Sequence, residues 1–143
     1  MRYLSLVLPF VLAACASAAR APAPTDVSDA AAAQAAGLAL KMVGKPYRYG
    51  GAAPSGFDCS GLASYAYAQI GKSVPHYTGA IWAAFPKVPS DQLEPGDMVF
   101  FNGLGHMGIY IGGGQYVHAP HTGDVVKVSS LGDRSDYVGA VRP

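Results

Sequence analysis

The heptapeptide Gly56–Leu62, "GFDCSGL", marks the point where a glycine-rich loop turns into a helix and carries one of only two cysteines. Asp58 is a favoured N-cap residue, so a helix is predicted to begin at Cys59. A sulfur atom in the first turn of a helix meets unpaired N–H groups and the positive end of the helix dipole, and both favour the thiolate. The stretch therefore predicts a reactive thiol, with a buried inert thiol as the alternative.

The segments around this stretch predict helices first and strands afterwards. Helices are expected over residues 28–43, ended by Gly44, and over residues 59–70, ended by Gly71, with a short helix around 80–85. The hydrophobic period then changes to two, which predicts strands over residues 96–101, 106–111, 115–119, 124–131 and 137–143. This order indicates an α+β domain, with N-terminal helices packed on an antiparallel sheet of about five strands.

Gly112–Gly114 separates two of these strands and predicts a hairpin with a three-residue loop. In that register His118 lies opposite Gly108, and His106 is its diagonal neighbour on the same face, about 7–8 Å away. The hairpin is therefore expected to have one face with two histidines and one core face. The core face would carry Met107, Ile109, Ile111, Val117 and Ala119.

Cys59, His106 and His118 together supply the groups that a nucleophilic thiol site needs. A histidine beside the thiol lowers its pKa and later protonates a leaving amine. A second polar group fixes the tautomer and orientation of that histidine. The chain has neither HExxH nor paired CxxC spacing, so no metal and no cofactor is expected.

Five segments, in this order, resemble the motifs of the NlpC-type cysteine peptidases, a family of papain-like domains that cut cell-wall peptides. They are "PYRYGG" (46–51), "FDCSGL" (57–62), "LEPGDMVFF" (93–101), "HMGIYIGGGQYVHA" (106–119) and "YVGAVRP" (137–143). The resemblance runs from about Asp29 to the end of the chain. It implies the papain-like NlpC fold, with Cys59 as nucleophile, His106 as base and His118 as the third polar residue. It also implies that the Tyr47 hydroxyl lies near the thiol and that backbone N–H groups near Cys59 hold the oxyanion.

The resemblance implies a peptidoglycan hydrolase that cuts stem peptides between γ-D-glutamyl and a diamino acid. An N-acetylmuramoyl-alanine amidase on the same fold and a catalytically silent wall-binding lipoprotein are the alternatives. Asp58 and Ser60 are candidate substrate-binding residues, although Asp58 is first of all an N-cap. His76, in "VPHYTGA" (74–80), stands where the family often has arginine, which leaves the substrate contacts open. His76 and His121 are otherwise expected to be solvated loop residues.

The N-terminus has the pattern of a secretory signal: Arg2, an apolar run over residues 4–12, and small residues. "LAAC" (12–15) resembles the lipobox of bacterial lipoproteins, which implies a signal peptide over 1–14 and a lipid on the sulfur of Cys15. An ordinary signal peptide with an incidental Cys15 is the alternative. Residues 15–27 are then a flexible tether and 28–143 the peptidase domain. The signal pattern implies an exported protein, and by the same resemblance Ala16 after the cysteine implies anchoring in the outer membrane, facing the periplasm.

The charge balance limits the classes of partner. Charged residues make up 13% of the 143 residues and the formal net charge is +1, whereas a nucleic-acid binder should have a strong basic excess. The expected partners are peptidoglycan peptides and, through the lipid anchor, a membrane. We expect a monomer, and a regulator that the sequence does not identify, because wall hydrolases endanger the cell that makes them.

Overall fold

A computed structural model describes residues 24–143 of the chain. Three α-helices, eight strands and two short 3-10 helices follow one another in these residues. The helices are α1 (Pro24–Leu40), α2 (Cys59–Ala68) and α3 (Thr78–Ala84), and the 3-10 helices are η1 (Asn102–Leu104) and η2 (Leu131–Asp133). The strands are β1 (Ala52–Ala53), β2 (Gly56–Phe57), β3 (Lys87–Val88), β4 (Met98–Phe101), β5 (His106–Gly112), β6 (Gln115–His118), β7 (Lys127–Ser130) and β8 (Tyr137–Val141).

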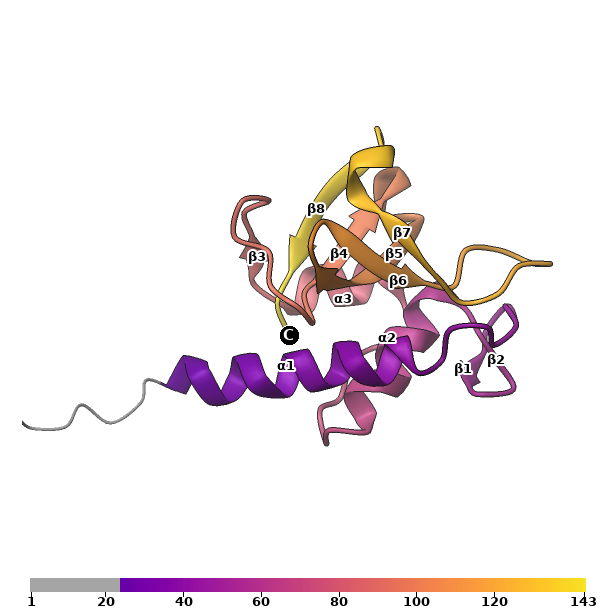
Figure 1. Ribbon diagram of the computed structural model, residues 1–143, viewed down its shortest axis with the longest axis horizontal. Coiled ribbons are helices and arrows are strands. Elements are labelled where there is room, and N and C mark those ends of the chain that lie inside the picture. The colour runs from indigo at the N-terminus through magenta and orange to yellow at the C-terminus, as the bar shows by residue number, and fades with distance from the viewer. Residues whose placement is uncertain (1–23) are drawn as a thin grey trace, which may run out of the picture.

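Six of the strands form one antiparallel sheet in the order β3-β8-β4-β5-β6-β7. Helices α1 and α2 lie together along one side of this sheet, and the small β1–β2 pair lies beyond the end of α2 (Figure 1). The predicted α+β architecture, with helices on an antiparallel sheet, is confirmed, and the sheet has six strands where about five were expected.

The additional strand is β3, in a segment that the sequence predicts as loop. It has two residues, it is flanked by Pro86 and Pro89, and it pairs only with β8 at the edge of the sheet. A strand this short has no detectable alternation, and only its partner defines it. The β1–β2 pair was missed for the same reason, because it turns around Pro54 within a glycine-rich stretch.

Helix α1 starts four residues before the predicted start and ends three residues before the predicted end. Residues 41–44 form turns, and the N–H of Gly44, at a φ of +89°, donates to the carbonyl of Val126 at 2.8 Å. This long-range bond holds the chain away from the helix, and Pro46 keeps it extended. Helix α2 ends at Ala68, two residues before the predicted Ile70, and Gly71 follows it at a φ of +77°.

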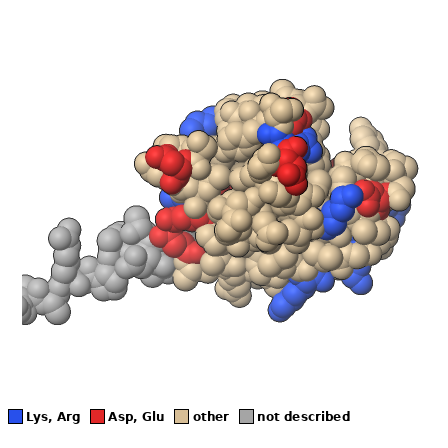
Figure 2. Space-filling view, turned by 45° about the horizontal axis from the view of Figure 1, so that its top comes forward, with Lys and Arg blue, Asp and Glu red and all other residues tan. Residues whose placement is uncertain are grey.

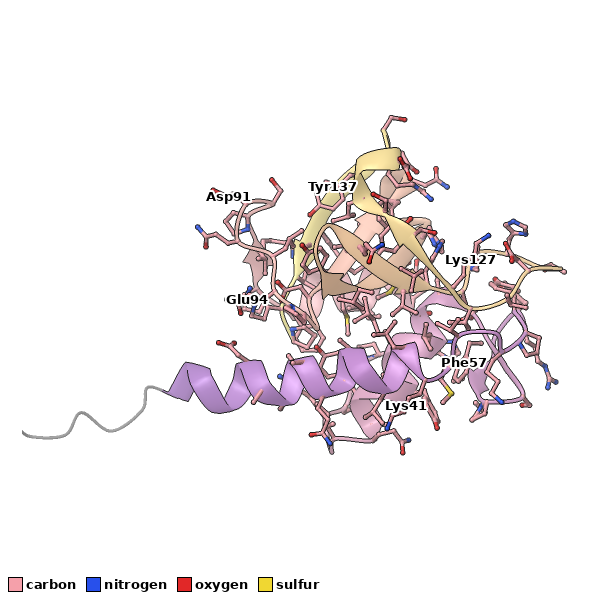
Figure 3. The ribbon with its side chains drawn as sticks, in the orientation of Figure 1. Lys41, Phe57, Asp91, Glu94, Lys127 and Tyr137 are labelled. Atoms are coloured by element: carbon pink, nitrogen blue, oxygen red, sulfur yellow. The ribbon has the colours of Figure 1, made fainter. Side chains whose placement is uncertain are left out.

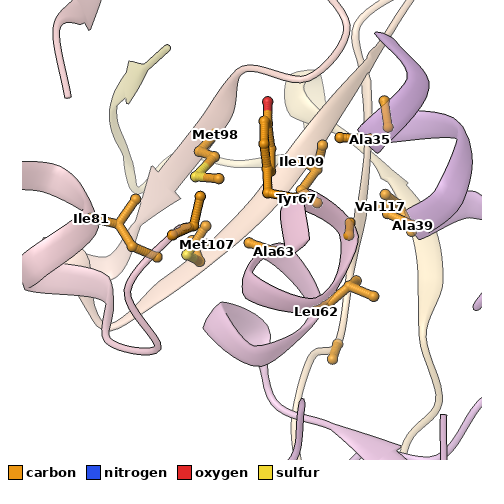
Figure 4. Packing of buried hydrophobic residues seen from close by; sticks show 14 of the residues in the cluster. Ala35, Ala39, Leu62, Ala63, Tyr67, Ile81, Met98, Met107, Ile109 and Val117 are labelled. Atoms are coloured by element: carbon orange, nitrogen blue, oxygen red, sulfur yellow. The ribbon is translucent and has the colours of Figure 1, made fainter. Parts of the chain in front are cut away.

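The main core lies between the helices and one face of the sheet (Figure 4). Ala35 and Ala39 of α1 face the sheet with no exposed surface, because small side chains let this helix approach closely. Leu62, Ala63 and Tyr67 of α2 pack beside them against Met98, Met107, Ile109 and Val117 of the strands.

The opposite face of the sheet carries a second, smaller cluster of buried side chains. Val99, Phe101, Tyr116 and Ala140 form it, with Tyr137 and Leu131 packed against them. Tyr137 lies at the start of β8, in the sheet layer above α1 (Figure 3). Charged side chains occur in small separate groups on the face shown in Figure 2, in keeping with the low content of charged residues.

Candidate active site

Cys59 is the first residue of α2, where the sequence places it. Asp58 precedes it in an extended conformation, and its Oδ1 accepts the Gly61 N–H at 2.6 Å, which is the predicted N-cap bond. Gly61 is needed because a Cβ there would lie 1.9 Å from the carbonyl oxygen of Gly51. That carbonyl accepts the Asp58 N–H at 3.0 Å. The glycine-rich loop is thus pressed onto the first turn of the helix, and this contact positions the thiol.

The thiol of Cys59 is half-buried between the start of α2 and the start of β5. The backbone N–H groups of Met107, Ser60 and Cys59 itself act to lower the pKa of the thiol. Burial, and then the negative charge of Asp58, raise the pKa of Cys59 by more, so that it lies above the ordinary value for a thiol. The backbone at the helix N-terminus thus acts in the predicted direction, but burial and the charge of Asp58 outweigh it, and the sequence does not show the extent of burial.

His106 and His118 meet on the predicted hairpin. Ile109 pairs with Val117, and Tyr110 with Tyr116, in the predicted register. Nε2 of His106 lies 2.7 Å from Nδ1 of His118. The loop differs from the prediction: Gly112 pairs with Gln115, only Gly113 and Gly114 make the turn, and the extra residue is a bulge in β5. A bulge near the loop absorbs one residue, so the register at the histidines is unchanged.

The face that carries the histidines is not the open polar face that alternation predicts. The second cluster covers it, and the ring of His106 stacks on Phe101 with centroids 6.1 Å apart. His118 is 4% exposed, and its ring lies 4.7 Å from that of Tyr116. Burial lowers the pKa of His106 to about 4 and that of His118 to about 3, so both rings are neutral near pH 7. A neutral imidazole is the form that accepts a proton.

A groove of about 430 Å³ opens over the thiol. The groove is lined by Tyr47, Tyr49, Gly50, Asp58, Cys59, Ser60, His76, Tyr77, Thr78 and Gly105. The last of these, Gly105, is the residue before His106 in the sequence. Burial, then the negative charges of Cys59 and Asp58, raise the pKa of Tyr47. Its phenol is therefore protonated near neutral pH and can donate a hydrogen bond beside the thiol. The structure thus brings Tyr47, Asp58, Cys59 and Ser60, all candidates from sequence, to one groove.

The carboxylate of Asp58, which lines this groove, accepts four hydrogen bonds. Oδ1 takes Gly61 N–H, the Ser60 hydroxyl at 3.4 Å and Nε2 of His76 at 2.7 Å, while Oδ2 takes Gly50 N–H at 3.1 Å. His76 is an exposed loop residue, as predicted, but its imidazole also hydrogen-bonds Asp58, which the prediction did not include. The loop over residues 72–77 returns to the start of α2 and places His76 against Asp58, a contact that no spacing in the sequence reveals. His121, by contrast, is a loop residue with 74% of its side chain exposed.

Sequence reasoning missed Ser129. Its Oγ lies 2.8 Å from Nε2 of His118, on the side of that ring away from His106. Ser129 pairs with Tyr116 across β6 and β7, which makes it the diagonal neighbour of His118. The sequence "KVSS" (127–130) could have indicated a serine near His118, because it is a strand with one serine on each face. The register was not readable, because the connection over residues 119–126 is too long to set it.

Some expectations lie outside the described residues: the signal peptide over 1–14, lipidation at Cys15 and most of the tether over 15–27. Within residues 24–143, no helix has the length and apolar character needed to cross a membrane. The same residues contain no cluster of three or more histidine, cysteine, aspartate or glutamate side chains that could hold a metal ion.

The candidate site combines a thiol at a helix N-terminus with two linked imidazoles, on an α+β scaffold. The sequence pattern of the NlpC/P60 family matches residues 44–138, and the chain belongs to that family. It is 46% identical over 88 residues to the "Probable endopeptidase p60" of Listeria seeligeri, covering 59% of this chain and 17% of the relative. It is 37% identical over 115 residues to the "Murein DD-endopeptidase MepH" of Escherichia coli, covering 72% of this chain and 42% of the relative.

Solved structures agree with this family assignment. The crystal structure of the NlpC/p60 domain of the peptidoglycan hydrolase SagA superposes with a TM-score of 0.70 at 39% identity. That match covers 77% of this chain and 97% of the SagA domain. The chain spans less than half the length of the two curated relatives above.

Proposed function

We propose that this protein is a cysteine endopeptidase that hydrolyses the stem peptides of peptidoglycan, with Cys59 as nucleophile and His106 as base. The observation that carries the proposal is the position of the thiol at the start of α2, where the backbone N–H of Met107, the residue after His106, acts to lower the pKa of Cys59. The names of the family relatives, which include endopeptidases and a peptidoglycan hydrolase, support the substrate class.

The proposed reaction uses the neutral forms of both groups. His106 bonds His118 through Nε2, so its Nδ1 is the ring nitrogen left to take the thiol proton as sulfur attacks the peptide carbonyl. The tetrahedral oxyanion is held by backbone N–H groups at the start of α2. The C–N bond then breaks, and His106 gives its proton to the leaving amine. Water hydrolyses the thioester, with His106 again acting as base, and the thiol is restored.

Asp58 and Tyr47 are proposed to contact the substrate in the groove, with Ser60 supporting Asp58. Asp58 is the carboxylate of the groove, and a carboxylate there suits the free amino group of a peptide. Ser60 is 5% exposed and its hydroxyl points to Asp58, so we assign it to orienting that carboxylate. Tyr47, with its protonated phenol, is placed to donate to a substrate oxygen.

The bond we propose is the one between γ-D-glutamyl and a diamino acid. A second candidate is the D,D cross-link between stem peptides, because MepH, which aligns over 72% of this chain, is named a murein DD-endopeptidase. An amidase that separates peptide from sugar uses the same thiol chemistry and is the third product class to look for.

The test is a digest of purified peptidoglycan by the full chain and by Cys59→Ala, with products identified by mass spectrometry. Fragments that end in D-glutamate, present with wild type and absent with Cys59→Ala, are expected. Separated cross-links would move the function to a D,D-endopeptidase, and sugar-free peptides would move it to an amidase. Equal products from both proteins would eliminate Cys59 as nucleophile. No products from either, on sacculi or isolated peptides, would favour a wall-binding protein.

We also propose that the protein is exported and anchored by a lipid on Cys15 in the outer membrane, facing the periplasm. The lipobox-like segment over 12–15 supports this assignment. Growth with a clickable fatty acid should label the wild-type protein and leave Cys15→Ser unlabelled, and membrane fractionation should place the label in the outer membrane. Equal labelling of the two proteins, or none, would refute the anchor.

A further inference from the structure

Ser129 closes a line of three side chains that starts at the base of the proposed reaction. His106 contacts His118 through Nε2 and Nδ1 at 2.7 Å, and Nε2 of His118 contacts the Ser129 hydroxyl at 2.8 Å. His118 is 4% exposed, so its second nitrogen has no access to bulk water and depends on Ser129 for a partner. The three side chains come from β5, β6 and β7, whose pairing fixes their order.

Two arrangements of hydrogen atoms fit these heavy-atom positions. Burial keeps both imidazoles neutral, so each ring has one N–H, and only one hydrogen lies between the rings. In the first arrangement His106 donates from Nε2, its Nδ1 is an acceptor, and His118 donates from Nε2 to Ser129. In the second, Ser129 donates to Nε2 of His118, which donates from Nδ1, and the hydrogen of His106 is on Nδ1.

Only the first arrangement permits the proposed reaction. Nδ1 of His106 must be free of hydrogen to take the thiol proton, and it is free only while Ser129 acts as acceptor toward His118. The Ser129 hydroxyl can donate or accept a hydrogen bond. It serves as the acceptor for His118 when its own hydrogen is donated to a different group.

The Tyr116 phenol supplies a destination for that hydrogen. Ser129 is the direct cross-strand partner of Tyr116, and Ser129 and Arg134 both act to lower the pKa of the Tyr116 phenol; Arg134 can only donate. Arg134 is itself held by Asp136, with Nε–Oδ1 and Nη2–Oδ2 distances of 2.7 and 2.6 Å. If Ser129 also donates to Tyr116, only its lone pairs face His118.

We propose that Ser129 is a positioning residue that accepts the Nε2 hydrogen of His118, donates its own to Tyr116, and thereby holds His106 in the tautomer with a free Nδ1. This inference rests on the proposed roles of Cys59 and His106. It adds a residue from β7 to Cys59, His106 and His118.

The test is nitrogen-15 NMR of the full chain labelled in histidine, which reports the hydrogen on each ring nitrogen without any turnover. In wild type, the Nε2 of both histidines should carry hydrogen. Ser129→Ala removes the acceptor and should give a mixture of tautomers, with a loss of about tenfold to a hundredfold in kcat/KM. Ser129→Thr keeps the hydroxyl and should restore the wild-type pattern. Ser130→Ala is the matched control, because the Ser130 side chain caps no helix and is on the other face of β7.

Tyr116→Phe gives an independent test that leaves Ser129 in place. The Ser129 hydrogen, deprived of its acceptor, is then free to point at His118, and the same mixture of tautomers is expected. Hydrogen on Nδ1 of His118 in wild type would overturn the inference, as would an unchanged pattern in both Ser129→Ala and Tyr116→Phe. A wild-type protein with the expected tautomers but no hydrolysis of peptidoglycan would instead refute the proposed function and leave the assignment of Ser129 standing.

Discussion

His76 donates a hydrogen bond to Asp58 across the end of the groove, with Nε2 2.7 Å from Oδ1. The direction is fixed, because an ionised carboxylate can only accept. The bond joins a loop before α3 to the N-cap of the helix that begins with Cys59. Asp58 therefore caps the helix, orders Ser60 and faces the groove at the same time.

Replacing His76 should alter substrate binding more than the chemical step. His76→Ala leaves Asp58 with its backbone partners but removes one wall of the groove, so we expect KM for a free-amino stem peptide to change several-fold with kcat within about twofold. Steady-state kinetics on a defined tripeptide would measure both constants. His121→Ala, which changes a side chain that is 74% exposed and does not line the groove, should leave both unchanged. A large fall in kcat for His76→Ala with KM constant would contradict this role.

The alkylation rate of Cys59 should follow a pKa above that of an ordinary thiol. Burial and then Asp58 raise the pKa of Cys59, so the rate of reaction with iodoacetamide should still be rising above about pH 8.5. Asp58→Asn keeps a capping side chain but removes the charge, and it should shift the profile to lower pH. Asp124→Asn, which neutralises a surface carboxylate, is the control. Full reactivity of the wild type already at pH 6 would show instead that a thiolate–imidazolium pair forms in the resting enzyme.

Stability should fall as the pH drops below about 6.5. The pKa values of His106 and His118 are lowered to about 4 and about 3, so an unfolded chain binds protons near pH 6.5 that the folded chain does not. The stabilisation is complete above pH 6.5 and is lost progressively toward pH 4, at up to about 1.4 kcal/mol per pH unit for each histidine. Urea unfolding at a series of pH values would measure the slope.

A matched pair of variants separates these two histidines from the other titrating groups. His118→Asn should reduce the slope between pH 6 and 4.5 by about half, because one of the two buried imidazoles is gone. His121→Gln should leave the slope as it is, since that imidazole is already exposed when folded. Equal slopes in wild type and His118→Asn would show that the imidazoles are not what makes the folded state sensitive to acid.

Two glycine substitutions should change stability in opposite directions. Gly61→Ala places a methyl group 1.9 Å from the Gly51 carbonyl oxygen, so it should cost at least about 1–3 kcal/mol and displace the thiol. Gly37→Ala, within α1, meets no atom within 4 Å and should stabilise by about 0.5–1 kcal/mol. Chemical denaturation of both variants, beside iodoacetamide reactivity, would test the pair. A Gly61→Ala protein as stable and reactive as wild type would show that the loop is not pressed onto α2.

The residues that bear the proposed chemistry were accessible from sequence because local rules position them. Asp58 before Cys59 is a capping pattern, and it places the sulfur in the first turn of a helix. Glycines and alternation around residues 112–114 give the hairpin register, which survives a one-residue error in the loop because a bulge absorbs it. In both cases the interacting residues are separated by a few positions or by one tight turn, so covalent geometry restricts the possibilities.

Only the tertiary structure decided the surroundings of those residues. The bond from His76 to Asp58 spans 18 residues, and the second cluster that buries His106 and His118 draws on β4 and β8 as well as the hairpin. Ser129 reaches His118 only through the pairing of β6 with β7, across a connection whose length does not fix a register. Burial sets the direction of the pKa shift at Cys59 and at both histidines, and burial is the summed effect of contacts distant in sequence. The sequence by itself therefore determined which groups are candidates for the proposed chemistry, and the packed structure decided their protonation and their partners.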